Sequence, residues 1–222
     1  MPDPMTASTP AIAGPLALEH VTIQLPGVTL IDSLNLAIAP GEVVTIMGPS
    51  GSGKSTLLAF LTGTLDSSFN ASGRVMLGGR DITALAPQVR RLGILFQDDL
   101  LFPHLSVGEN LAFGLSDAIK GRAARWERIR QALADGGLAG FERRDPATLS
   151  GGQRARVALL RTLLSEPLAL LLDEPFNKLD AQLRDEFRRF VFDHVATDRL
   201  PTLLVTHDRA DAEAARGRVI TL

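Results

Sequence analysis

Residues 48–56 combine glycines, a lysine and hydroxyl side chains at a spacing that suits phosphate binding. They are, in order, Gly48, Pro49, Ser50, Gly51, Ser52, Gly53, Lys54, Ser55 and Thr56, and they fit the pattern G-x-x-x-x-G-K-[ST]. The glycines let backbone N–H groups surround a phosphate, while Lys54 and the Ser55 hydroxyl can reach phosphate oxygens and Mg²⁺. The alternative is a glycine-rich turn that ends in Lys-Ser by chance. The apolar segment 43–47 before the loop favours the first interpretation, because it supplies the strand that the motif requires.

Two adjacent carboxylates, Asp173 and Glu174, follow the apolar segment 168–172. The carboxyl end of a buried parallel strand is where open α/β sheets bind ligands. One carboxylate there can organise Mg²⁺, and the other can accept a proton from an attacking water. The alternative is a strand that ends in acidic residues without a role in chemistry. The presence of the Lys54 loop in the same chain makes this alternative less favoured.

A third segment, residues 149–153, reads Leu-Ser-Gly-Gly-Gln. Ser150 is typical of a helix N-cap, and the N–H groups of Gly151 and Gly152 can approach an anion. An ordinary helix start is the alternative. With this segment the chain resembles the ATP-binding cassette (ABC) ATPases, whose signature reads LSGGQ, over residues 16–222. The resemblance implies an α/β fold: a P-loop NTPase (RecA-like) core with an N-terminal antiparallel β lobe and an inserted helical lobe.

The resemblance also implies roles for single residues. Glu174 would polarise the attacking water, His207 would contact the γ-phosphate, and Gln97 would reach Mg²⁺ and the water. The metal set would be Ser55, Gln97 and Asp173, with ATP and Mg²⁺ as cofactors. In a head-to-tail dimer, the segment Ser150, Gly151, Gly152 and Gln153 would meet ATP held by the second copy, with Asp180 in the loop that crosses the interface.

The sequence departs from the family pattern in three places. Family members usually place an aromatic residue near the end of the first strand to stack on adenine, but here that stretch offers only Leu25. The usual Ser-Ala-Leu before Asp180 is replaced by Asn177, Lys178 and Leu179, which adds a positive charge near the expected dimer interface. We also expect a short form without a C-terminal regulatory domain, nearest to the ATPases of thiamine and iron importers.

Composition narrows the class of protein. The formal net charge of -2 does not favour nucleic acid as a partner, and we expect the arginine-rich stretches 122–130 and 154–161 to be solvated helix faces. Cysteine is absent, which removes disulfides and thiolate metal sites. The longest apolar runs are far shorter than the roughly 20 residues of a membrane helix. Residues 1–15, rich in proline, are expected to be a disordered tail.

Periodicity predicts the elements that position these residues. Alternating apolar residues over 16–25 and 34–38 predict an antiparallel β lobe, and strands are expected at 43–47, 74–77, 92–96, 168–172 and 202–206. Helices are expected from Lys54 and over 181–195 and 208–215. A helical lobe is expected over approximately 108–165, and the resemblance implies that residues 16–222 form one ATPase domain.

The leading hypothesis is the ATP-hydrolysing, energy-coupling subunit of an ABC importer, peripheral on the cytoplasmic face of the cell membrane. Its expected partners are a second copy, separate integral membrane permease subunits and a solute-binding protein. Residues 101–110, after Gln97, resemble importer ATPases, and we expect Phe102 and Leu105 to be exposed there for permease docking. The alternatives are a soluble non-transport ABC ATPase, such as an assembly or repair factor, and a small-molecule P-loop kinase.

Overall fold

The structure is a computed structural model that describes residues 14–222; all but the last two residues of the expected tail lie outside this part. It opens with an antiparallel hairpin of β1 (Leu16–Leu25) and β2 (Val28–Ile38), which turns at Pro26 and Gly27. β4 (Asn70–Leu77) pairs with β1, and the short β5 (Arg80–Asp81) extends the sheet to the order β2-β1-β4-β5. Alternation, with a register shift between Leu18 and Val21, buries Leu16, Leu18, Val21 and Ile23. The predicted antiparallel lobe is therefore confirmed.

The second sheet is parallel and carries the core of the molecule. Its order is β6-β7-β8-β3-β9, with β3 (Val43–Met47), β6 (Leu92–Leu95), β7 (Ala169–Asp173), β8 (Thr202–Thr206) and β9 (Arg218–Thr221). β7 and β8 are buried almost throughout, as strands covered on both faces must be. This sheet and its helices confirm the predicted α/β class.

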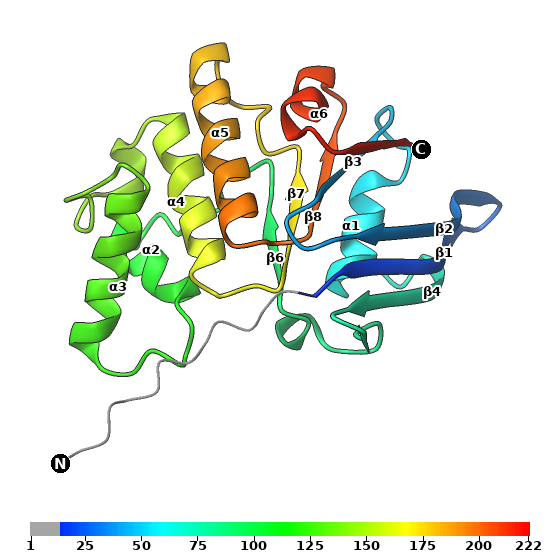
Figure 1. Ribbon diagram of the computed structural model, residues 1–222, viewed down its shortest axis with the longest axis horizontal. Coiled ribbons are helices and arrows are strands. Elements are labelled where there is room, and N and C mark those ends of the chain that lie inside the picture. Colours follow the sequence, from blue (N-terminus) through cyan, green and yellow to red (C-terminus); the bar gives the residue numbers. More distant parts are fainter. Residues whose placement is uncertain (1–13) are drawn as a thin grey trace.

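Helices cover both faces of the parallel sheet (Figure 1). α1 (Lys54–Thr62) packs between the two sheets, in one cluster with Leu171 of β7. On the opposite face, α4 (Gly151–Leu163) and α5 (Ala181–Thr197) pack in one cluster with Leu170 and Leu172. α6 (Arg209–Ala215) follows β8. Because α1 and α4 lie on opposite faces, the two glycine-containing motifs that begin them are kept apart within one chain.

Between β6 and β7 the chain forms a helical layer with its own core. α2 (Val107–Gly114), α3 (Arg122–Asp135), a 3₁₀ turn at Pro146–Thr148 and α4 enclose Val107, Leu111, Ile129 and Leu133, all fully buried. Figure 1 places this layer at the end of the molecule away from β1 and β2.

A buried arginine joins the antiparallel lobe region to the end of α1. Arg90, in the loop after a 3₁₀ turn at Pro87–Val89, donates hydrogen bonds to the carbonyls of Phe60 (2.9 Å) and Leu61 (2.6 Å) and to that of Leu85 (2.8 Å). A side chain at Gly63 would collide with its guanidinium. Burial lowers the pKa of Arg90, and the carbonyl acceptors satisfy the charge in place of a carboxylate.

Several predictions about the elements and surfaces were wrong. β9 was not predicted, β4 begins at Asn70 rather than at residue 74, and β6 ends at Leu95, leaving Phe96 exposed. The arginines of α4 are half-buried rather than fully solvated: Arg154 pairs with Asp99, Arg156 pairs with Glu186, and Arg161 donates to Leu100 O at 2.8 Å. In α3 the expectation holds for Arg122, Arg128 and Arg130, which are exposed, whereas Arg125 is half-buried and donates to three carbonyls around the end of α2.

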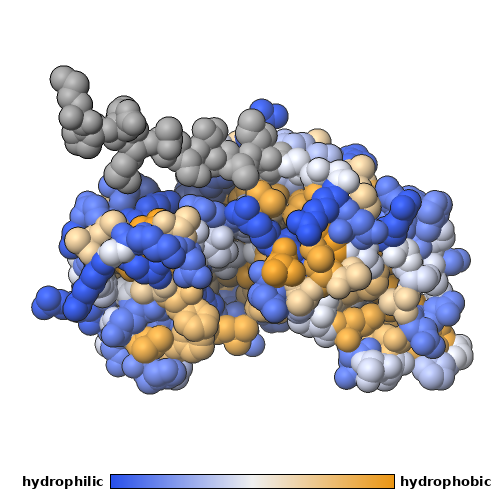
Figure 2. Space-filling model, turned by 90° about the horizontal axis from the view of Figure 1, so that it is seen from below, coloured by the Kyte–Doolittle hydropathy of each residue, from blue (hydrophilic) through white to orange (hydrophobic). Residues whose placement is uncertain are grey.

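Within residues 14–222, none of the helices has the length and apolar content to cross a membrane. On the face seen in Figure 2, apolar side chains gather in separate patches between hydrophilic ones.

Candidate nucleotide site

The loop between β3 and α1 forms a turn that is open for an anion. Gly51 (φ +84°) and Gly53 (φ +92°) adopt left-handed backbone conformations, which glycine tolerates without strain. A side chain at Gly48 would lie 2.6 Å from Ser52 Oγ. That hydroxyl is buried and has no hydrogen-bond partner within the described part of the chain. An unsatisfied donor in a glycine-lined turn at a helix N-terminus fits a phosphate group.

Lys54 is the first residue of α1, and its side chain folds back over this loop. Its Nζ donates to the carbonyls of Gly48 (2.8 Å) and Pro49 (2.7 Å), and the residue is only 6% exposed. An ammonium group has three donors, so one more is available to a phosphate oxygen. A hollow of about 890 Å³ opens beside Gly48 and Pro49 and is bounded by His207 and Val219.

Asp173 is the last residue of β7, which is separated from β3 by β8 in the parallel sheet. Asp173 and the loop after β3 therefore lie at the same, carboxyl end of the sheet. Burial raises the pKa of Asp173, the neighbouring Glu174 charge raises it further, and Lys54 and a hydrogen bond with Ser55 partly offset the rise. A carboxylate and a hydroxyl are hard oxygen ligands, and Mg²⁺ usually takes one or two carboxylates together with substrate phosphates and waters. Asp173 and Ser55 therefore fit Mg²⁺ bound with a nucleotide.

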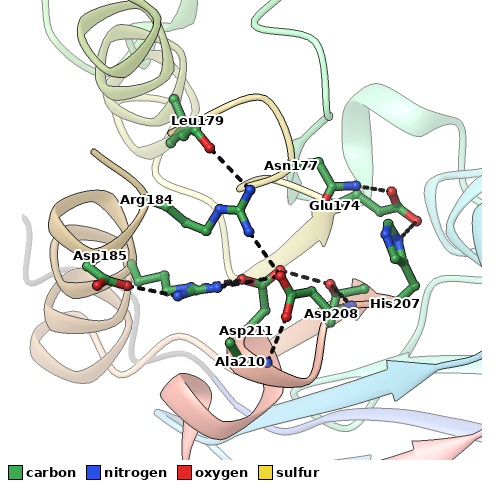
Figure 3. Close-up of polar contacts among 11 residues, drawn as sticks. Glu174, Asn177, Leu179, Arg184, Asp185, His207, Asp208, Ala210 and Asp211 are labelled. Carbon is green, nitrogen blue, oxygen red and sulfur yellow. Dashed lines mark hydrogen bonds and ion pairs between the residues drawn. The ribbon is translucent and has the colours of Figure 1, made fainter. Parts of the chain in front are cut away.

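Glu174 adopts a left-handed backbone conformation, with φ at +47°. Its N–H donates to Val205 O at 2.9 Å, which fixes the residue against the end of β8. Figure 3 shows the Glu174 carboxylate between two side chains: Oε1 lies 3.2 Å from His207 Nδ1, and Oε2 accepts a hydrogen bond from Asn177 Nδ2. His207, 58% exposed at its side chain, faces solvent on its other side.

Hydrogen bonds and ion pairs hold the backbone on both sides of His207 (Figure 3). Before it, the Thr206 hydroxyl donates to Asp211 Oδ2 at 2.9 Å, and Asp211 is fully buried against Arg188. After it, Asp208 accepts a hydrogen bond from Arg184 at 3.0 Å and caps α6 through Ala210 N. The loop at His207 is therefore fixed, while its ring stays accessible.

Gln97 does not join this group in the structure. It follows β6 with an exposed side chain, and within residues 14–222 no hydrogen bond ties it to Ser55 or Asp173. The residues after it are anchored elsewhere: Asp98 forms an ion pair with Lys178, and Asp99 pairs with Arg154 at 3.3 Å.

Ser150 caps α4, as predicted from sequence. Its hydroxyl accepts from Gln153 N at 3.3 Å, and the Gln153 side chain accepts from Ser150 N at 3.0 Å, which completes a capping box. Asp180 likewise caps α5, accepting from Leu183 N at 3.0 Å. Within the described residues no hydrogen bond or ion pair joins Ser150–Gln153 to the loop at residues 48–53.

Comparison with known proteins places this geometry in a family. The model of the ABC transporter family matches residues 31–177. The uncharacterized ABC transporter ATP-binding protein YnjD of Escherichia coli (strain K12) is 48% identical over 199 residues, which cover 90% of this chain and 91% of that protein. The chain belongs to the ABC transporter ATP-binding family.

Two further relatives are longer than this ABC chain. The sulfate/thiosulfate import ATP-binding protein CysA of Xanthomonas campestris pv. campestris is 41% identical over 93% of this chain and 61% of its own length. The Fe(3+) ions import ATP-binding protein FbpC 1 of Rhizobium meliloti is 40% identical over 94% of this chain and 58% of its own length. ATP-binding subunits of this family hydrolyse ATP to drive transport. This chain is therefore an ABC transporter ATPase subunit.

Sequence reasoning missed three residues that shape the site of this ABC ATPase. Asn177 contacts Glu174, Arg184 binds Asp208 and the Leu179 carbonyl, and Asp208 caps α6. The departure from the family pattern at Asn177 was the only sequence feature that could have drawn attention to this residue. Arg184 lies four residues after the α5 cap and gave no comparable signal.

Proposed function

We propose that the chain is the energy-coupling ATPase subunit of an ABC importer, that it works as a head-to-tail homodimer, and that residues 16–222 form one ATPase domain with a helical lobe at 108–165. Its partners are integral membrane permease subunits and a solute-binding protein, which places it on the cytoplasmic face of the membrane. The two relatives named above as import ATP-binding proteins support import as the direction of transport, since they share 40–41% identity with almost all of this chain.

One observation carries the catalytic proposal: the Glu174 carboxylate is held at the edge of the parallel sheet, next to Asp173 and in contact with His207. Lys54, Ser55 and the N–H groups of residues 48–56 bind the phosphates, and bound Mg²⁺ would neutralise charge that develops on the transferred phosphoryl group. Glu174 accepts the proton of the attacking water, because its carboxylate is oriented and keeps free lone pairs. His207 orients that carboxylate and presents its exposed ring edge to the γ-phosphate.

The position of Ser150 supports a dimer. Its capped helix presents free N–H groups and the positive end of the helix dipole, which attract an anion. Since α4 and α1 cover opposite faces of the parallel sheet, a second copy is needed to supply a phosphate to this helix. Asp180, which begins α5 beside this region, belongs to the same interface, and Gln97 would reach the metal only after its loop moves.

Exposed apolar side chains around the Gln97 loop support permease docking. Phe113 is 71% exposed on α2, and Phe96 (43%) and Leu100 (56%) flank Gln97 in sequence. The Phe113 ring packs on Phe102 with centroids 4.7 Å apart. Phe102 and Leu105, expected to be exposed, are instead half-buried, and Phe102 supports the exposed Phe113 ring. Exposed apolar groups of this kind suit a partner helix.

Two variants test the catalytic proposal. Glu174→Gln should bind ATP normally but lose turnover by about 10² to 10⁴-fold, because the amide keeps the shape and cannot accept the proton. Lys54→Ala should lose ATP binding and turnover together, since the ammonium is needed in the ground state as well. Calorimetry with ATP and a phosphate-release assay measure these quantities. Parental turnover in Glu174→Gln would refute the role of Glu174.

Purification of the tagged protein from native membranes tests the transport assignment. Integral membrane subunits should accompany the parent protein. Their absence, with ATP hydrolysis retained, would favour a soluble ABC ATPase.

A further inference from the structure

We propose that Asn177 is a positioning residue for ATP hydrolysis: its side-chain amide holds the Glu174 carboxylate in the orientation that accepts a proton from water. This inference rests on the proposed function of Glu174 and extends it to a side chain at which the sequence departs from the family pattern.

The contact itself is directional. Asn177 Nδ2 donates to Glu174 Oε2, while His207 Nδ1 lies 3.2 Å from Oε1, so each carboxylate oxygen has its own side-chain partner (Figure 3). A carboxylate offers about four lone-pair sites, so two remain free. The plane of the carboxylate is thus fixed by two contacts, and it can still bind a water.

The backbone of Glu174 explains why the carboxylate needs such a contact. At φ +47°, a non-glycine residue is held in a sparsely populated conformation that persists only when its surroundings fix it. The N–H of Glu174 donates to Val205 O, and Asn177 N donates back to Glu174 O at 3.3 Å, which closes a turn. This turn brings the Asn177 side chain back over the side chain of Glu174.

Packing on both sides of Asn177 fixes the loop that carries it. Phe176 is fully buried, with its ring 5.8 Å from that of Phe187 and 5.9 Å from that of Phe192. Leu179 is also buried, and its carbonyl accepts from Arg184 at 3.1 Å. Lys178, between these anchors, points outward to Asp98. Two buried anchors therefore leave Asn177 little freedom to move away from Glu174.

The test is a double-mutant cycle on the full chain, with Mg·ATP as substrate. Asn177→Ala should lower kcat about tenfold, because a misplaced catalytic group reacts slowly, and should leave the Kd for ATP within about twofold. In a Glu174→Gln background the same change should alter residual turnover by less than about twofold, since the group that it positions is already disabled.

Asn177→Asp provides a second variant of nearly the same shape. It replaces the donor with a carboxylate that repels Glu174, so kcat should fall at least as far as in Asn177→Ala. The matched control is Asn35→Ala, which removes side-chain hydrogen bonds that an exposed asparagine of β2 makes with His20 and Ser33 rather than with a residue of the site, and should leave kcat unchanged. Melting curves establish that each variant is folded.

The outcomes separate the two proposals. If Glu174→Gln turns over like the parent, the proposed function of Glu174 is wrong. If Glu174→Gln is slow but Asn177→Ala and Asn177→Asp match the parent, only the role of Asn177 is wrong. An equal loss in both backgrounds, or a weaker Kd that accounts for the whole effect, would likewise overturn the positioning role.

Discussion

Arg184 Nη1 donates to Asp208 Oδ2 at 3.0 Å and joins the first turn of α5 to the residue directly after His207. The same guanidinium donates to Leu179 O at 3.1 Å, in the loop between Glu174 and Asp180. Both side chains of the pair are about three-quarters buried. One arginine thus fixes the backbone of the two loops whose side chains, Glu174 and His207, meet at the candidate site.

Arg184→Ala should lower the stability of the protein and slow hydrolysis. Hydrogen bonds to charged groups contribute about 1.5 to 3 kcal/mol, and each kcal/mol shifts the melting temperature of a domain of this size by about 2 to 4 °C. The double variant Arg184→Ala, Asp208→Ala should lose less stability than the sum of the single variants. Strict additivity in melting experiments would show that the pair contributes nothing by itself.

Acidification should remove the Mg²⁺-dependent part of ATP affinity earlier than an ordinary aspartate would. Burial and Glu174 raise the pKa of Asp173, so its carboxylate becomes protonated at a higher pH and stops serving as a ligand. Calorimetry with ATP, in Mg²⁺ and in EDTA, measures the difference across pH. Asp173→Asn should have little Mg²⁺-dependent affinity at any pH; an unchanged pH dependence in this variant would contradict the assignment.

The same raised pKa makes a prediction for the protein without ligands. Folding favours the protonated form of the Asp173 carboxyl, because its pKa is higher in the folded state than in the unfolded chain. The stability that this proton contributes is fully present below the ordinary aspartate pKa and is lost as the pH rises through the raised pKa of the folded protein. Asp173→Asn should remove this decline in chemical denaturation at a series of pH values.

Leu25→Trp should tighten ATP binding about fivefold, which corresponds to about 1 kcal/mol, and should favour ATP over GTP. Leu25 is half-buried at the end of β1, where an aromatic face could supply the missing stacking surface. Titrations with both nucleotides measure the effect. If neither affinity changes, adenine binds elsewhere, for example against Phe69, which is half-buried and packs on the core around α1.

Phe113→Ala with Leu100→Ala should weaken co-purification with membrane subunits without unfolding the domain. Both side chains are exposed, so their removal costs the isolated chain little, whereas exposed aromatic anchors often dominate an interface. Val28→Ala, at an exposed apolar residue of the antiparallel lobe, is the matched control. Parental recovery of the membrane subunits with the double variant would contradict the docking surface.

The parallel strands could be predicted because buried strands are rich in apolar residues. β3 and β8 have the bounds expected from sequence, since strands covered on both faces read as apolar runs. β9 is not an apolar run: Arg218, Val219 and Thr221 are exposed, and the strand forms because its backbone pairs with β3. A short edge strand of this kind depends on its neighbour more than on its own residues.

The motifs located the phosphate loop and the carboxylates, but they could not show how the side chains are held. The Asn177 contact depends on the left-handed backbone conformation of Glu174. This conformation is unfavourable for most residues, and no spacing rule predicts it. The Arg184 contact joins residues 24 positions apart and depends on how α5 packs against α6. The metal role of Gln97 was implied only by the family resemblance and stays a prediction; in the structure its side chain is exposed, and its loop follows the contacts of Asp98 and Asp99.

Arg90 makes the junction between α1 and the loop before β6 insensitive to acid and alkali. A guanidinium stays protonated in proteins, and its carbonyl acceptors here have no proton to gain or lose near neutral pH. Lysine would not replace it, because an ammonium lacks the planar fork that reaches several carbonyls at once. A fall in pH that protonates the Asp173 carboxylate at the other end of α1 therefore leaves the framework behind this helix in its shape.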